Sequence, residues 1–135
     1  MRVKIMSSMA AAAMLMAAVP AWAHHAFAAE FDAQKPVKLR GTVTKVELIN
    51  PHSWIHIDVK NADGTVTNWM VEGGSPNALV RRGVTKNSIP VGSEIVVEGY
   101  AAKDGSSHAN GRDITFADGK KLFVGGSNPD EQPSK

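Results

Sequence analysis

The chain has 135 residues, of which 43% are hydrophobic, and it contains no cysteine. This is the size of one domain that relies on its core, and the composition excludes disulfides and thiolate metal sites. Two of the 15 Lys and Arg residues, Arg2 and Lys4, precede residue 24, whereas all 13 Asp and Glu residues follow it. A chain without this segment is formally neutral, which argues against a nucleic-acid partner.

Residues 1–23 carry the three-part pattern of a secretory signal peptide that is cleaved. A positive start is followed by an apolar run, and Ala21-Trp22-Ala23 is a small-x-small cleavage site. The apolar run is shorter than the roughly 18–20 residues that span a membrane. We therefore expect a periplasmic protein that begins at His24 and has no membrane span after cleavage. Cleavage at Ala26-Phe27-Ala28, farther from the apolar run, would instead remove both His24 and His25.

Residues 24–36 are expected to form an N-terminal arm. Phe27 and Phe31 are four residues apart, so they share one face of a helical turn or act as single anchors of an extended arm. Both alternatives predict an arm that docks on the domain. Residues 37–124 are expected to form that domain, and residues 125–135, which have no apolar side chain, to be a disordered tail.

The pattern of apolar residues predicts five or six strands. The first changes parity near Thr44-Lys45, which indicates a bulge and a strong bend. Asn50-Pro51 makes a turn, and Asp63-Gly64 is typical of the hairpin between the next two strands. The expected strands cover residues 37–48, 54–59, 65–72, 94–102, 113–116 and 122–124.

One short helix is expected after the third strand. Ser75 and Pro76 are residue types typical of the N-cap and the first helical position, and Gly83 supplies the C-terminal stop. The order of elements predicts a mainly β fold, a small five- to six-stranded antiparallel barrel. It would be OB-like (the oligonucleotide/oligosaccharide-binding type), with the helix between strands three and four. A sandwich of two sheets is the alternative.

Several blocks of this sequence resemble a family of small exported bacterial proteins of unknown function. The blocks are HHAFAAEFD, GTVTKVELINPHSWIHIDV, SPNALVRRG, and VEGYAAKDGS followed by GRDITFADGKKLF. They extend over nearly the whole chain beyond residue 23. The resemblance implies periplasmic residence and a compact β-rich fold, and it implies no reaction.

The histidines are the best candidates for chemistry. His52 and His56 are four residues apart, but in a strand this spacing separates them by roughly 13 Å, too far for one metal ion with ligand distances of about 2 Å. Cleavage after residue 23 would give His24 a free α-amino group beside its imidazole. That chelate suits copper or another divalent metal, with His52 or His25 as a further ligand. Alternatively, these histidines are ordinary exposed or turn residues.

Trp54, His56 and Trp69 form a second candidate site, a face for a ligand. Trp54 and His56 alternate on one strand, and Trp69 lies on the strand expected to pair with it, so outward-facing rings would make an aromatic platform. We favour a core position for Trp69 and leave Trp54 open between core and surface.

The sequence contains no nucleophile elbow, HExxH motif or phosphate-binding loop, so an enzyme is the less favoured class. We expect a non-enzymatic binding or accessory protein that binds copper or another divalent metal through His24, with His52 and His25 as the other candidate ligands. The alternative is a metal-free interaction module that contacts another envelope protein, or a small ligand, through its barrel face.

Overall fold

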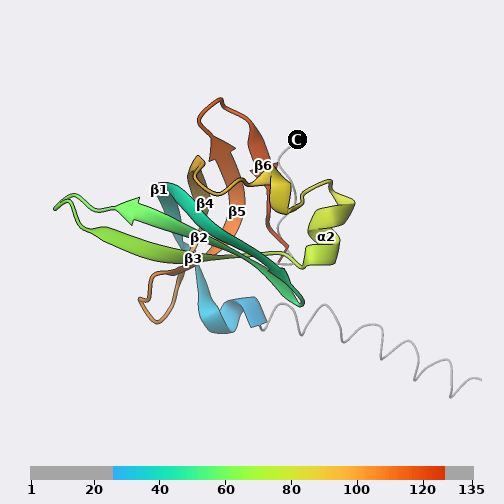
Figure 1. Cartoon of the computed structure of the whole chain (residues 1–135). Coiled ribbons are helices and arrows are strands. Elements are labelled where there is room, and N and C mark those ends of the chain that lie inside the picture. Colours follow the sequence, from blue (N-terminus) through green and yellow to red (C-terminus); the bar gives the residue numbers. More distant parts are fainter. Residues whose placement is uncertain (1–25, 127–135) are drawn as a thin grey trace, which may run out of the picture.

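The computed structural model describes residues 26–126 (Figure 1). The expected signal peptide, both His24 and His25, and the tail from residue 127 onward lie outside the described residues. Within residues 26–126, no helix has both the length and the apolar character needed to cross a membrane.

The structure is mainly β, as expected from the sequence. Residues 26–30 form a helical turn, and six strands follow with two short helical elements between the third and fourth. The elements are β1 (Phe31–Ile49), β2 (His52–Lys60), β3 (Val66–Gly73), α2 (Pro76–Arg81), η1 (Lys86–Ser88), β4 (Glu94–Ala102), β5 (His108–Phe116) and β6 (Lys121–Phe123).

Two strands begin earlier than the sequence pattern indicates. β1 begins at Phe31 because this residue of the arm pairs with Ala102 of β4. β5 begins at His108, not at Asp113, because its first residues pair with β3 and β4 together. The Phe31–Ala102 and β3–β5 pairings join segments that are far apart in the sequence, so alternation within one segment could not reveal them.

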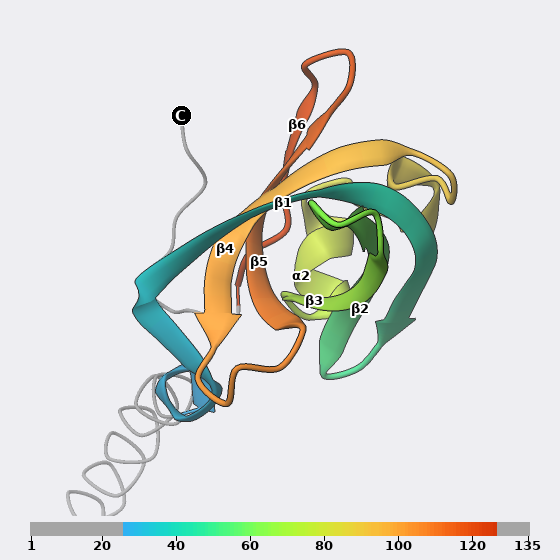
Figure 2. The same cartoon turned by 90° about the vertical axis from the view of Figure 1, so that its left-hand side faces the viewer.

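The strands form one sheet in the order β3-β2-β1-β4-β5-β6, with an additional pairing between β3 and β5. That last pairing is parallel and joins residues 70–72 to 108–110, whereas the other pairings are antiparallel. It brings β3, the edge strand of this order, against β5, and the sheet therefore has the ring-like shape of Figure 2.

The bend of β1 makes this closure possible. The register of β1 against β2 shifts between Val43 and Lys45, at the place where the sequence changes parity, so the predicted bulge is confirmed. Residues 45–49 pair with β2 alone, residues 36–41 pair with β4, and Thr42 pairs with both strands. At the adjacent Gly41 a Cβ would stand 2.6 Å from the Asp58 carbonyl oxygen, so the close approach requires glycine.

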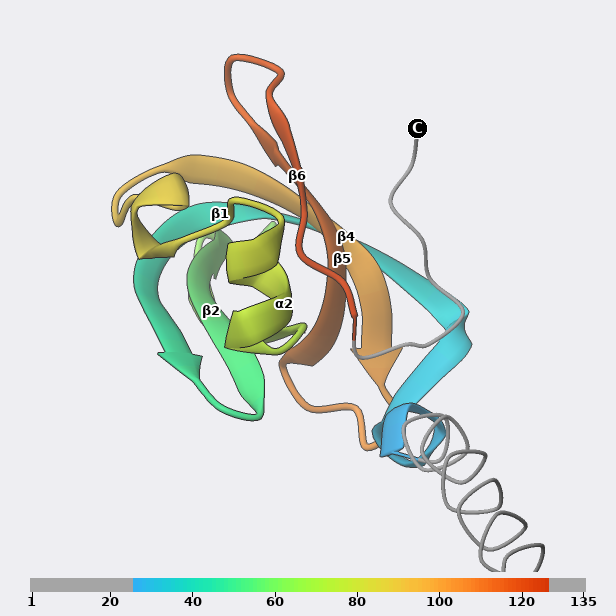
Figure 3. The same ribbon diagram turned by 90° about the vertical axis from the view of Figure 1, so that its right-hand side faces the viewer.

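The core lies inside the ring. Ile55 and Ile57 of β2 and Val71 of β3 point inward and are fully buried. α2 lies against one end of the ring, near the segment that follows β6 (Figure 3), where Leu79 joins the core and Arg82 Nη1 donates a hydrogen bond to the Gly125 carbonyl oxygen at 2.8 Å.

A second, smaller apolar cluster holds the residues that precede the domain. Phe27 and Phe31 are buried together with Ala102, and Tyr100 packs against them. The Phe27 ring lies 5.6 Å from the Phe31 ring and meets the Tyr100 ring edge-on at 5.8 Å between centroids. The helical turn of residues 26–30 is therefore attached to the outer side of β4.

The close pairing of β4 with β5 predicts that one added methyl group at Gly99 destabilises the protein. A Cβ at Gly99 would lie 1.8 Å from the Asn110 carbonyl oxygen, and both partners are held by the sheet. We expect Gly99→Ala to lower the free energy of unfolding by about 1–3 kcal/mol or more, measured by urea denaturation. Lys60→Ala, at an exposed strand end, should change it by less than about 0.5 kcal/mol. Equal stability of the two variants would contradict this packing.

The start of α2 gives a second prediction. The Ser75 hydroxyl accepts a hydrogen bond from the Ala78 amide at 3.2 Å, and Pro76 occupies the first helical turn. We expect Ser75→Ala to lower the free energy of unfolding by about 1 kcal/mol and Ser75→Asp to preserve it. A stability unchanged by Ser75→Ala in the same denaturation experiment would show that the cap contributes nothing.

Candidate functional site

The closure of the sheet brings two rows of side chains together on the outer face of β2, β3 and β5. One row follows the register Trp54–Glu72–Asn110, and the adjacent row follows His56–Met70–His108. These residues alternate with the inward-pointing core residues of the same strands, so they face away from the core. We call this surface the outer-face cluster, together with His52, two residues before Trp54 on β2.

Glu72 lies at the centre of the outer-face cluster. Its side chain is only 6% exposed, and its two carboxylate oxygens face different histidines. Oε1 is 3.0 Å from His52 Nδ1, and Oε2 is 3.7 Å from His108 Nε2, which is within ion-pair range but too long for a hydrogen bond. Because a buried carboxylate is costly without polar partners, these imidazoles help to stabilise Glu72 in its buried position.

Two aromatic rings fix the position of His108. The Trp54 ring lies 5.3 Å from the His108 ring at an angle of 36°, and the Phe31 ring meets it edge-on at 5.0 Å. Trp54 also stands 6.4 Å from the His52 ring. The indole therefore lies beside both imidazoles that face Glu72.

Buried polar atoms gather next to this carboxylate. Among the described residues, His108 Nε2 and both polar atoms of the Asn110 side chain are buried and have no hydrogen-bond partner. Asn110 is completely buried and stands in register with Glu72. Unpaired buried polar atoms cost about 1–3 kcal/mol each, so their concentration beside one carboxylate marks this surface as a candidate binding site.

The other candidate histidines have different positions. His56 Nε2 lies 3.0 Å from Glu47 Oε2, and Lys45 Nζ lies 2.7 Å from the other oxygen of Glu47. Hydrogen bonds from Lys45 and His56 lower the pKa of the Glu47 carboxyl group. His52 and His56 thus contact different glutamates, His52 contacting Glu72 and His56 contacting Glu47. His24 and His25 lie outside the described residues.

The predicted aromatic face is divided between two sides of the sheet. Trp54 and His56 both lie on the outer face, whereas Trp69 pairs with the inward-pointing Ile57 and packs against the core. Trp54 therefore shares its surroundings with His52 and His108 and not with Trp69.

Sequence reasoning missed Glu72, His108 and Asn110. The signal for Glu72 was present, because extending the register of the Asp63-Gly64 hairpin outward places it opposite Trp54. No comparable signal existed for His108 and Asn110, since only the parallel β3–β5 pairing brings them to Glu72. Within residues 26–126, no three His, Asp or Glu side chains form a group that could hold a metal ion by themselves.

A surface depression adjoins His108. It has a volume of about 640 Å³ and lies between the helical turn of residues 26–30 and the connection from β4 to β5. Lys103 Nζ donates a hydrogen bond to the Ala28 carbonyl oxygen across it, and the side chain of Lys103 thus ties the turn to the domain. The depression gives solvent access to one side of the His108 ring. Its lining residues are Ala29, Glu30, Ala102, Lys103, Asp104 and His108.

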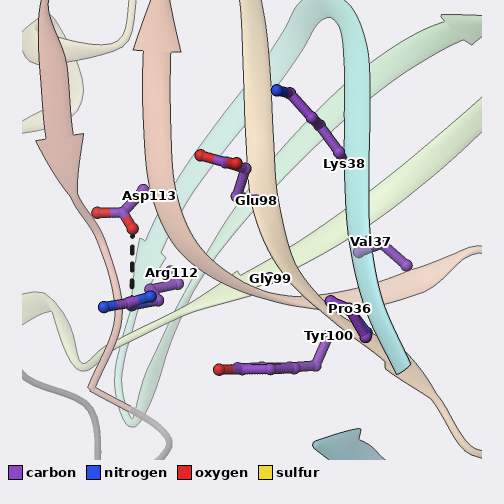
Figure 4. A pocket seen from close by; sticks show the side chains of 8 residues that line it. All are labelled: Pro36, Val37, Lys38, Glu98, Gly99, Tyr100, Arg112 and Asp113. Atoms are coloured by element: carbon purple, nitrogen blue, oxygen red, sulfur yellow. Dashed lines mark ion pairs between the residues drawn. The ribbon is translucent and has the colours of Figure 1, made fainter. Parts of the chain in front are cut away.

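A separate depression of about 380 Å³ lies on the outer face of β1, β4 and β5 (Figure 4). Two acidic side chains, Glu98 and Asp113, are paired in register there. Arg112 Nε lies 3.6 Å from Asp113 Oδ2, and Lys38 stands in register with Glu98. Two positive groups thus balance two negative ones, so this depression offers no excess charge to a metal ion.

Comparison with known proteins identifies the family of this chain. No curated protein and no solved structure matches the chain. The model of the family of unknown function DUF6152 matches residues 12–111, a segment that includes every residue of the outer-face cluster. Because this match covers more than half of the sequence, the chain belongs to the family of unknown function DUF6152.

Proposed function

We propose that the protein is an exported, periplasmic, non-enzymatic binding protein that takes up copper or another divalent metal through its mature N-terminal His24 together with His52, Glu72 and His108. The observation that carries this proposal is the nearly buried Glu72 carboxylate with an imidazole nitrogen facing each oxygen. Imidazole and carboxylate groups are ligands for divalent copper and zinc.

The separations of these atoms support the proposal. Two ligands that each lie about 2.1 Å from one tetrahedral metal ion are roughly 3.4 Å apart. The observed nitrogen–oxygen distances of 3.0 Å and 3.7 Å lie on either side of that value. Each imidazole nitrogen therefore lies about as far from the Glu72 carboxylate as two ligands of one ion lie from each other.

The N-terminus of the processed chain would complete the site. Cleavage after residue 23 leaves His24 two residues before the helical turn that begins at Ala26. Phe31, at the end of that turn, packs against His108. The α-amino group and imidazole of His24 would add two nitrogen ligands of the kind that Cu(II) prefers, and His25 is the neighbouring alternative.

The proposed fold class agrees with a ligand surface at this position. We propose that the ring of strands is a small OB-like barrel. The circular order β1-β2-β3-β5-β4 and the helix between β3 and β4 support this class. OB barrels bind their ligands on the face of strands two and three, and β2 and β3 carry His52, Trp54 and Glu72.

The first test compares three single-histidine variants of the protein recovered from the periplasm. We expect His52→Ala and His108→Ala each to weaken Cu(II) or Zn(II) binding by about tenfold or more, because each removes a ligand. His56→Ala is the matched control and should bind as the unaltered protein does, since His56 faces Glu47. Isothermal calorimetry gives the affinities, and the intact mass gives the cleavage site.

Two results would overturn the proposal. One is a protein that binds neither ion but forms a stable complex with an envelope protein in the absence of metal, which would favour the interaction module. The other is an equal loss of affinity in all three variants.

The second test addresses the carboxylate. We expect Glu72→Gln to weaken Zn(II) binding by about 10–100-fold, because a neutral amide is a poorer ligand and holds the two imidazoles less firmly. Glu47→Gln is the matched control, since it removes the carboxylate that faces His56 and leaves Glu72 in place. Calorimetric titration of both variants decides the question, and a Glu72→Gln protein with unaltered affinity would remove Glu72 from the site.

A further inference from the structure

We infer that Met70 is a soft ligand beside this site and that, with His108, it lets the site bind Cu(I) in addition to divalent ions. The inference rests on the proposed function and adds a second oxidation state of copper. Five of the six methionines lie in residues 1–16, and Met70 is the sixth. Its side chain is 40% exposed on the outer face of β3.

The register of the sheet places Met70 between two imidazoles. Its Cα is paired with that of His56 across β2–β3 and with that of His108 across β3–β5. Neighbouring strands of a sheet lie about 4.7–4.9 Å apart, so side chains paired in register on one face are neighbours. The backbone at this position is also fixed, because the Met70 amide donates to the Ser107 carbonyl oxygen at 3.0 Å.

The thioether is chemically suited to one oxidation state. Thioether and imidazole ligands accept Cu(I), whereas zinc sites in proteins are built from thiolate, imidazole and carboxylate ligands. The three rotatable bonds of a methionine side chain let the sulfur reach an ion bound at His108. Glu72, in the adjacent row, offers the hard oxygen ligand, so the two rows of the outer-face cluster present ligands of opposite character.

Trp54 offers a cation–π contact to an ion bound at His108. Its ring lies 5.3 Å from the His108 ring, and Trp54 is paired with Glu72, one row from Met70. The face of an indole attracts a cation within about 6 Å of its centroid. A Cu(I) ion held by two protein ligands has a low coordination number, and it leaves space for this contact.

The experiment measures Cu(I) and Zn(II) affinities of the same variants. Under anaerobic conditions, we expect Met70→Leu to lower the Cu(I) affinity by about tenfold or more in competition with bicinchoninate. The Zn(II) affinity should be unchanged, because leucine preserves the volume of the side chain. Val66→Leu is the matched control, since Val66 is exposed on the same face of β3 and should leave both affinities unchanged.

X-ray absorption on selenomethionine-labelled protein supplies a direct readout. A copper–selenium distance should be present in the unaltered protein and absent in Met70→Leu. An unchanged Cu(I) affinity in Met70→Leu would overturn the inference and leave the proposed imidazole site intact. An equal loss of Cu(I) and Zn(II) affinity would also overturn it, because the effect of the thioether would then not be specific to Cu(I). Failure of the unaltered protein to bind either ion would overturn the proposed function as well.

Discussion

The parallel pairing of Met70–Glu72 with His108–Asn110 is the contact on which both the closure of the sheet and the outer-face cluster depend. Without it β3 and the first residues of β5 would be open edges, which expose unpaired backbone groups. Its formation requires close packing on the inner side, where a Cβ at Gly111 would stand 2.6 Å from Val71 Cγ1. The same contact that buries the core therefore sets His108 beside Glu72.

The burial of polar side chains in the outer-face cluster lowers the free energy of unfolding. Glu72 is almost fully buried although it carries a carboxylate, and Asn110 is fully buried with an amide that has no hydrogen-bond partner in residues 26–126. Apolar side chains at both positions would avoid these desolvation costs. Elsewhere the described chain is locally consistent, with apolar residues inside the ring and charged residues outside. Departures from that consistency are expected at functional sites.

The features that could be predicted from the sequence are those with a local physical cause. The bulge near Thr44-Lys45 follows from a change of parity within one strand, and the helix start at Ser75 follows from its capping hydroxyl. The start of β5 could not be predicted, because Ala109 and Gly111 gain their positions from β3 and β4 and not from their own pattern. His52 was identified from its residue type, while Glu72 and His108 required the register of three strands.

This difference also explains why the proposed metal site is hard to recognise in this sequence. Helical metal motifs place ligands three or four residues apart, so their spacing is visible in the chain. Here the proposed ligands of the described chain come from β2, β3 and β5, and His52 and His108 are 56 positions apart and meet only at one carboxylate. In a sheet the neighbours of a residue lie across strands, and the spacing along one strand separates side chains instead of gathering them. The pair that the sequence suggests, His52 with His56, is thus divided between Glu72 and Glu47 by the same geometry that unites His52 with His108.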